Sequence, residues 1–197
     1  MLNFNLNKML ISRFENTDIE RHILEFENKY AFKFPVEYRE MLQRYNGGDT
    51  PDTTFKINKI SSDLEGFFGL GDAEVFLNYS SLEKSSWLSL FLKDGFIPIG
   101  TNVFGDYVLI GIAEKNEGKV FFYFHDRGKR YIELTSDFKS FVKQCKSQKI
   151  GHVRSIEERR NGMISNGLGD KITIQKIAAW QAEIDKYGNI KQEELVL

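Results

Sequence analysis

The first residues whose types and spacing could do chemistry are the neighbours His125 and Asp126. A His-Asp dipeptide is typical of metal-dependent phosphohydrolases, but such a site needs further ligands held at set positions. The other two histidines, His22 and His152, have no ligand pattern beside them. Because the dipeptide ends a predicted strand and precedes Arg127-Gly128, we interpret it as a turn and expect no metal site.

Nucleophiles and phosphate loops give no stronger signal. Cys145 is the single cysteine, and it lies on the apolar stripe of a helix predicted over residues 136–149, where a thiol is inert. No serine lies in a G-x-S-x-G elbow. The glycine-rich segments 46–49 and 66–71 lack the Gly-Lys-Ser/Thr ending of a phosphate loop. We therefore predict no catalytic residue and no cofactor, and we expect the chain not to be an enzyme.

Charge patterning points instead to binding. Residues 60–83 contain no Lys or Arg, and acidic residues lie within and just before this window. A local acidic face on a near-neutral chain can steer a basic partner, although it can also be a solvated face with no partner. The candidate partner-binding residues in this region are Asp49, Asp52, Asp63, Glu65, Asp72 and Glu74, with Phe67, Phe68 and Tyr79 as candidate aromatic anchors that are equally suited to the core.

Composition restricts the function classes further. The 197 residues include 27 Lys and Arg against 28 Asp and Glu, a net charge of −1, which argues against a generally basic nucleic-acid binder. The basic stretch 143–160 lacks stacking aromatics, so we expect no direct nucleic-acid contact there. No apolar run approaches the 18 residues of a membrane span, and residues 1–8 do not resemble a signal peptide. The expected location is the cytoplasm, with no membrane partner.

The hydrophobic period changes along the chain. Apolar spacing predicts helices over residues 17–30, begun by a Thr17–Glu20 capping box, and from Pro35 to about residue 46. Short strands follow, with a mixed segment over 80–91 and Pro98 at an edge or strand end. The predicted strands are 54–57, 67–70, 96–99, 107–112, 120–124 and 131–134. This order favours an α+β fold with a mostly antiparallel sheet flanked by helices.

The last part of the chain differs in character. Residues 151–170 have a loop-like composition, and an amphipathic helix with Trp180 on its apolar face is predicted over 173–187. We divide the chain into a domain over 1–150 and a C-terminal extension over 151–197. The apolar face of the helix must be covered by the domain, by a second copy in a homodimer, or by a partner.

Several short motifs, taken in order, resemble the SUKH superfamily, the yeast Smi/Knr type of domain. The segment Phe34-Pro35-Val36-Glu37-Tyr38 precedes a helix that ends in Tyr45-Asn46-Gly47-Gly48. The later motifs are Phe67-Phe68-Gly69-Leu70, Phe96-Ile97-Pro98-Ile99-Gly100, Phe104-Gly105-Asp106-Tyr107, and Val120-Phe121-Phe122-Tyr123-Phe124-His125-Asp126, before the predicted 136–149 helix. The resemblance covers residues 11–149 and leaves 151–197 outside.

What the resemblance implies is a single α+β domain without catalytic machinery. Bacterial members resemble immunity proteins that bind and neutralise polymorphic toxin domains, often nucleases, whereas eukaryotic members resemble interaction proteins in cell-wall or cell-cycle signalling. A short compact chain is similar to the bacterial kind. Shared polar positions of the family add Asn46, Gly48, Gly105, Asp106 and Asp126 to the candidate surface, with the glycines expected to be structural.

Overall fold

The protein divides into two compact units. This computed structural model describes residues 8–128, 130–188 and 190–197, so the stretch judged above not to be a signal peptide lies outside the described residues apart from Lys8. The main unit comprises Met1–Gln148 and Gln192–Leu197, and the second comprises Lys149–Lys191. The expected extension ran to residue 197, but the last six residues belong to the main unit. Leu195 is buried there, and its N–H donates to the Met9 carbonyl at 3.0 Å.

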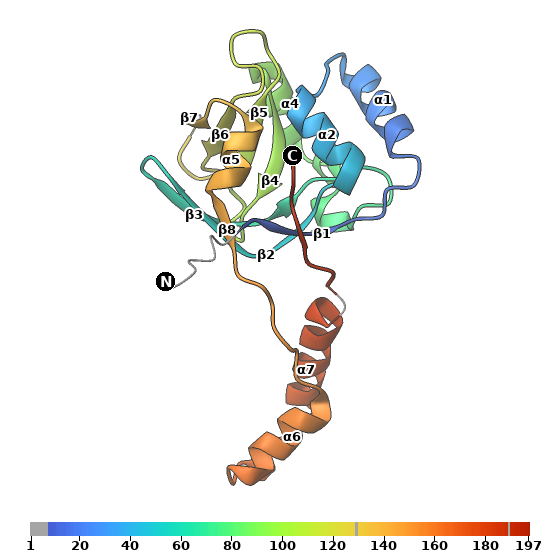
Figure 1. Cartoon of the computed structure of the whole chain (residues 1–197), viewed down its shortest axis with the longest axis vertical. Coiled ribbons are helices and arrows are strands. Elements are labelled where there is room, and N and C mark those ends of the chain that lie inside the picture. The colour runs from blue at the N-terminus through green and yellow to red at the C-terminus, as the bar shows by residue number, and fades with distance from the viewer. Residues whose placement is uncertain (1–7, 129, 189) are drawn as a thin grey trace, which may run out of the picture. The chain divides into compact units, whose positions relative to one another are not determined.

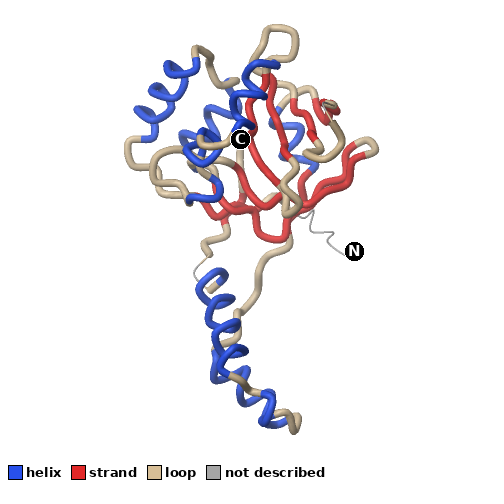
Figure 2. Tube along the Cα trace, turned by 180° about the vertical axis from the view of Figure 1, so that it is seen from behind, coloured by secondary structure: helices blue, strands red, loops and turns tan. Residues whose placement is uncertain are grey.

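An antiparallel sheet forms the middle of the main unit (Figures 1 and 2). Within the described residues its order is β7-β6-β5-β4-β3-β2-β1-β9, and β8 pairs with β2 beside β1. The strands are β1 Leu10–Arg13, β2 Gly48–Ile57, β3 Ile60–Phe67, β4 Phe96–Thr101, β5 Tyr107–Gly111, β6 Val120–Tyr123, β7 Tyr131–Thr135, β8 Cys145–Ser147 and β9 Glu193–Glu194.

Helices cover both faces of this sheet, which confirms the expected α+β class. The main unit contains α1 Ile19–Tyr30, α2 Val36–Tyr45, η1 Val75–Leu77, α3 Tyr79–Glu83, α4 Ser86–Asp94 and α5 Phe138–Gln144. Figure 1 shows α2 and α5 on the same side of the strands. The second unit contains α6 Ile156–Ser165, η2 Gly169–Lys171 and α7 Ile174–Tyr187. No helix among the described residues is long and apolar enough to cross a membrane.

The main unit has two hydrophobic cores, because side chains alternate between the two faces of each strand. In β5, Val108 and Ile110 pack in the large core with α1, α2 and α5, whereas Leu109 packs in a second cluster with Phe91 of α4. Successive side chains of a strand point to opposite faces, so the consecutive buried residues Val108, Leu109 and Ile110 indicate a sheet covered on both sides. The two-sided burial makes β4, β5 and β6 a rigid platform for the loops at their ends.

Several sequence-based expectations are wrong, each for a tertiary reason. Helix α1 has no side-chain cap from Thr17; Asp18 occupies the N-cap in a left-handed conformation, and Glu20 instead accepts hydrogen bonds from Arg39 and Gln43 of α2. The expectation for Pro98 holds locally, since Pro98 lies inside β4 where Leu109 of β5 pairs with it and no residue of β3 does, so this part of β4 is an edge. A proline fits there because the missing N–H leaves no ladder bond unmade.

The strand and helix limits differ as well. The long hairpin of β2 and β3 replaces the short strands predicted at 54–57 and 67–70. Helix α5 ends at Gln144, and Cys145 begins β8, where it pairs with Phe55 of β2. Residues 156–165 were expected to be a loop but form α6. The helix begins at a capping box made by Ser155 and Glu158, which the loop-like composition of the segment did not indicate.

Candidate functional site

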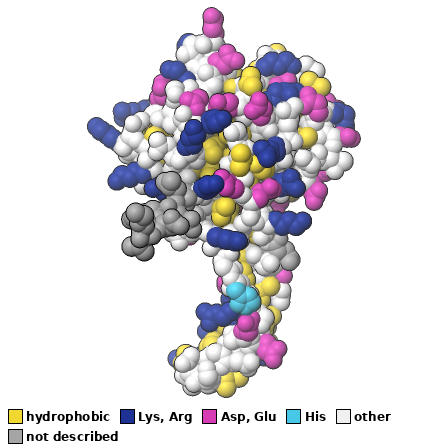
Figure 3. Space-filling view, in the orientation of Figure 1, with side chains coloured by type: hydrophobic (Ala, Val, Ile, Leu, Met, Phe, Trp, Pro, Cys, Tyr) yellow, Lys and Arg dark blue, Asp and Glu magenta, His cyan; other side chains and the backbone are white. Residues whose placement is uncertain are grey.

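A pocket of about 610 Å³ brings together three of the predicted acidic residues. Asp63 comes from β3, Asp106 from the turn before β5, and Asp126 from the turn after β6. We call this pocket the acidic groove, and its other lining residues are Thr54, Ser61, Ser62, Asn102, Phe104, Phe122, Phe124, His125 and Arg127. Acidic and basic side chains are interspersed on the face seen in Figure 3. The three carboxylates in the lining of the acidic groove are therefore a local cluster on a surface of mixed charge.

Asp106 holds two turns of the groove together. It is buried; its Oδ2 accepts from Asn102 Nδ2 at 3.1 Å, and its Oδ1 accepts from the His125 N–H at 3.1 Å. His125 Nδ1 also lies 2.8 Å from the same Oδ1. Asn102 Oδ1 in turn accepts from the N–H groups of Phe104 and Asp106 at 3.0 and 2.8 Å. Asp106 is therefore a positioning residue that fixes the turn carrying Phe104.

The same residues offer the strongest metal-ligand geometry of the described chain. Asp106, His125 and Asp126 each offer a ligand atom, all within 4.8 Å of one another. However, the 2.8 Å contact between His125 Nδ1 and Asp106 Oδ1 is a hydrogen bond, and both Asp106 oxygens already accept bonds from the protein. The turn interpretation of the His-Asp dipeptide accounts for these contacts without an ion.

The acidic groove combines an exposed and a half-buried carboxylate with an exposed aromatic ring. Asp126 is exposed and lies 3.8 Å from Arg127 Nε, whose guanidinium stacks 4.1 Å from the centre of the Phe124 ring. Asp63 is half-buried and accepts from the Val103 N–H at 3.1 Å. The Phe104 side chain is 73 % exposed. A large exposed ring on a turn fixed by hydrogen bonds suits a partner contact, because little conformational entropy is lost on binding.

A second exposed surface, the 72–76 turn, carries two more predicted residues. Asp72 and Glu74 flank Val75 and Phe76, and Val75 is 79 % exposed. Asn78 fixes this turn, since its Nδ2 donates to the carbonyls of Gly71 and Ala73 at 3.0 and 2.9 Å. Exposed apolar side chains rimmed by polar groups are the usual pattern of a protein-interaction surface.

Of the two roles that the sequence left open for Phe67, Phe68 and Tyr79, the structure shows the core role. Phe67, Phe68 and Tyr79 are all buried, and the Tyr79 hydroxyl donates to the Pro98 carbonyl at 2.8 Å. Among the described residues the most exposed rings are Phe76 and Phe104, which sequence reasoning missed. The sequence carries no clear signal for either ring, because Phe76 lies in the apolar triplet Val75–Leu77 that forms η1 and Phe104 lies beside Val103.

Asn46 does not share a surface with the carboxylates. It is 1 % exposed and caps α2 in a left-handed conformation, and its Oδ1 accepts from the Leu70 N–H at 2.8 Å while its Nδ2 donates to the Leu70 carbonyl at 2.9 Å. The following Gly47 and Gly48 have φ values of +75° and +143°, and a Cβ on either would lie within 2.6 Å of a backbone oxygen. These three residues build the α2–β2 corner.

The remaining predicted residues line β2 and β3. Asp49 is half-buried opposite Ser12 and Gly66, and Glu65 is half-buried on β3. Asp52 is exposed at φ +38°, where the β2–β3 register shifts. They are absent from the lining of the acidic groove. Only Asp63, Asp106 and Asp126 of the predicted set come together there.

The single thiol is buried rather than presented. Cys145 is 1 % exposed, and burial raises the pKa of its thiol well above the ordinary value. A thiol in such an environment stays protonated and is a poor nucleophile.

Residues 20–144 match the family described as SMI1 / KNR4 family (SUKH-1). The chain belongs to this family. The matched span of the SUKH-1 domain runs from the start of α1 to the end of α5 and contains both the acidic groove and the 72–76 turn. Strands β1, β8 and β9 and the second unit lie outside it. No curated protein matches the chain.

Proposed function

We propose that this SUKH-1 protein is a non-catalytic immunity protein that binds and neutralises a cognate polymorphic toxin domain. The observation that carries the proposal is the acidic groove, in which carboxylates from three separate segments lie beside an exposed Phe104 on a hydrogen-bonded turn. Family membership supports a protein-binding role. The complex would act in the cytoplasm by covering the toxin's active site.

A nuclease is the toxin class that the groove favours. Nucleases bind a polyanion, so their substrate clefts are basic. The carboxylates of Asp63 and Asp126 would meet such a cleft with opposite charge, which raises the association rate more than the final affinity. Affinity would come from Phe104, Val75 and Phe76, since a few large side chains usually dominate an interface.

The alternative is an intracellular interaction or regulatory module of the Smi/Knr type with no toxin partner. It would use the same surfaces, because exposed rings and carboxylates serve any protein partner of suitable charge. The genomic neighbourhood separates the two functions: a neighbouring gene for a large secreted protein with a C-terminal toxin domain favours the immunity protein.

The test is rescue of a cell that expresses that toxin domain. Co-expression of the wild-type chain should restore growth, and affinity capture should recover the toxin domain with the chain. Phe104→Ala combined with Phe76→Ala should abolish rescue while the free energy of unfolding stays within about 0.5 kcal/mol, because both rings are exposed. Exposed Val36→Ala on α2 is the matched control and should rescue fully. Capture of regulatory proteins only, with no toxin, would establish the alternative.

A further inference from the structure

The second unit cannot supply its own core. It spans Lys149–Lys191, and none of its described residues is buried. Units of about 40 residues usually need disulfides, metals or oligomerisation to be stable. The chain enters this unit after β8 and returns from it to form β9, so the unit is a hairpin of helices inserted in the main fold. We call it the helical hairpin.

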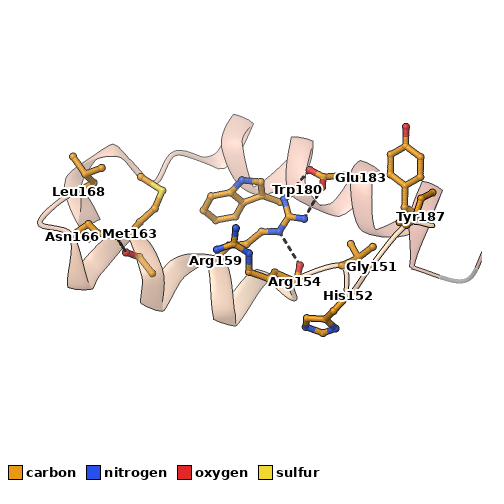
Figure 4. A pocket seen from close by; sticks show the side chains of 13 residues that line it. Gly151, His152, Arg154, Arg159, Met163, Asn166, Leu168, Trp180, Glu183 and Tyr187 are labelled. Atoms are coloured by element: carbon orange, nitrogen blue, oxygen red, sulfur yellow. Dashed lines mark hydrogen bonds and ion pairs between the residues drawn. The ribbon is translucent and has the colours of Figure 1, made fainter. Parts of the chain in front are cut away.

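A bidentate ion pair, which we call the polar clasp, joins the two helices of the hairpin. Arg159 of α6 donates through both Nη atoms to the carboxylate of Glu183 of α7, each at 2.8 Å, and its Nε donates to the Arg154 carbonyl (Figure 4). Trp180 lies beside this clasp in a pocket of about 530 Å³ between the helices. Bidentate pairs of this kind set orientation, so the hairpin has a defined inner face.

The hairpin also carries a second groove and an exposed isoleucine, Ile174, which we call the knob. The groove has a volume of about 740 Å³, and its apolar wall consists of Ile156, Ile164 and Ile172. Ile174 follows two residues later as the first residue of α7, and its side chain is 84 % exposed. Figure 3 shows apolar side chains at the hairpin surface. Exposed isoleucines beside a groove lined by isoleucines mark an uncovered contact surface.

We propose that a second copy of this chain covers this face. Two hairpins would pack around a two-fold axis so that Ile174 of each occupies the isoleucine groove of the other. A two-fold interface requires one patch to carry both complementary features, and the groove and the knob satisfy this requirement on one hairpin.

Local charges around the groove favour a second copy. Residues 149–191 contain eight Lys and Arg against five Asp and Glu, a net charge of +3, which acts against any basic partner and also against a second copy. The contact therefore needs opposite charges placed locally. A second copy brings Glu157 of the groove lining toward Lys171, three residues before Ile174, and neither forms an ion pair within the described part of the chain. Opposite charges around an apolar contact fix its register.

The test measures the mass of the full-length chain in solution at micromolar concentration by light scattering. The wild type should have the mass of two chains. Ile164→Glu in the groove and Ile174→Glu on the knob should each weaken self-association by at least about tenfold and shift the mass toward one chain. Val36→Glu is the matched control, because Val36 is also the first residue of a helix and is 72 % exposed, but lies on the main unit.

Each outcome decides the proposal. A one-chain mass for the wild type would overturn it and would point to docking of the hairpin on its own main unit. A dimer that persists in both isoleucine variants would also overturn it, since the contact would then lie elsewhere. Far-ultraviolet circular dichroism of the variants separates lost association from lost helix. Toxin capture by Ile174→Glu should match the wild type, so failure of the dimer and failure of the toxin-binding proposal remain distinguishable.

Discussion

Asn46→Ala should destabilise the fold strongly, although Asn46 belongs to the set predicted to bind a partner. The side chain pairs with both the N–H and the carbonyl of Leu70, and its Nδ2 also donates to the Glu15 carbonyl. Leaving a buried backbone group unpaired costs about 1–3 kcal/mol. Alanine is also strained in the left-handed conformation at φ +53°, by about 1 kcal/mol. The expected loss is about 4 kcal/mol of unfolding free energy.

Asn46→Gly separates the two contributions. Glycine loses the same hydrogen bonds but accepts the left-handed conformation, and it adds about 0.4–1 kcal/mol of unfolded-state entropy that opposes folding. The glycine variant should therefore exceed the alanine variant in stability by no more than about 0.6 kcal/mol, while remaining well below the wild type.

Urea unfolding followed by tryptophan fluorescence and circular dichroism measures both variants. The reasoning is refuted if Asn46→Ala costs less than about 1 kcal/mol. It is equally refuted if the variant keeps wild-type stability but loses its partner, because Asn46 would then contact the partner directly.

Three further results should follow. Reversing charge with Asp63→Lys and Asp126→Lys should slow association with a basic partner and weaken its salt dependence in stopped-flow mixing, whereas reversal at exposed Glu114, away from the groove, should change neither. Hydrogen bonds from the Ser155 N–H and from His152 lower the pKa of Glu158 from 4.5 to about 2, so its stabilisation of α6 is complete above 4.5 and is lost as the pH falls through 2. Acid titration of helicity should show that loss in the wild type and not in Glu158→Gln. Cys145 should react with a thiol reagent only at the rate of unfolding, and rapid labelling of the native chain would contradict its burial.

Patterns within short segments predicted the helices and strands that depend mainly on their own residues. The apolar period of their own residues predicted α1, α2, α7, β5 and β6. The sequence also indicated a structural role for Gly48. The predicted capping box at Thr17 was wrong, because Glu20 accepts hydrogen bonds from Arg39 and Gln43 of α2 instead. The limits of α5 were wrong because β2 offered Cys145 a strand partner, which no pattern within residues 136–149 records.

The candidate site shows the same division between local and distant causes. The sequence indicated carboxylates at Asp63, Asp106 and Asp126, but they are 20 or more positions apart in the chain and could not be grouped before the sheet register was known. It also could not show that Phe67 is buried while Phe104 is exposed, since both lie next to glycine-rich turns.

The sequence by itself determined the family, the α+β class and the absence of a recognisable catalytic motif, because these depend on residue types and short spacings along one segment. Only the tertiary structure decided which carboxylates share a groove, which rings reach the surface, and that Leu195 returns to the main unit after the helical hairpin. The physical reason is that burial and pairing are set by segments far apart in the chain, and their contacts exist only after the strands have met.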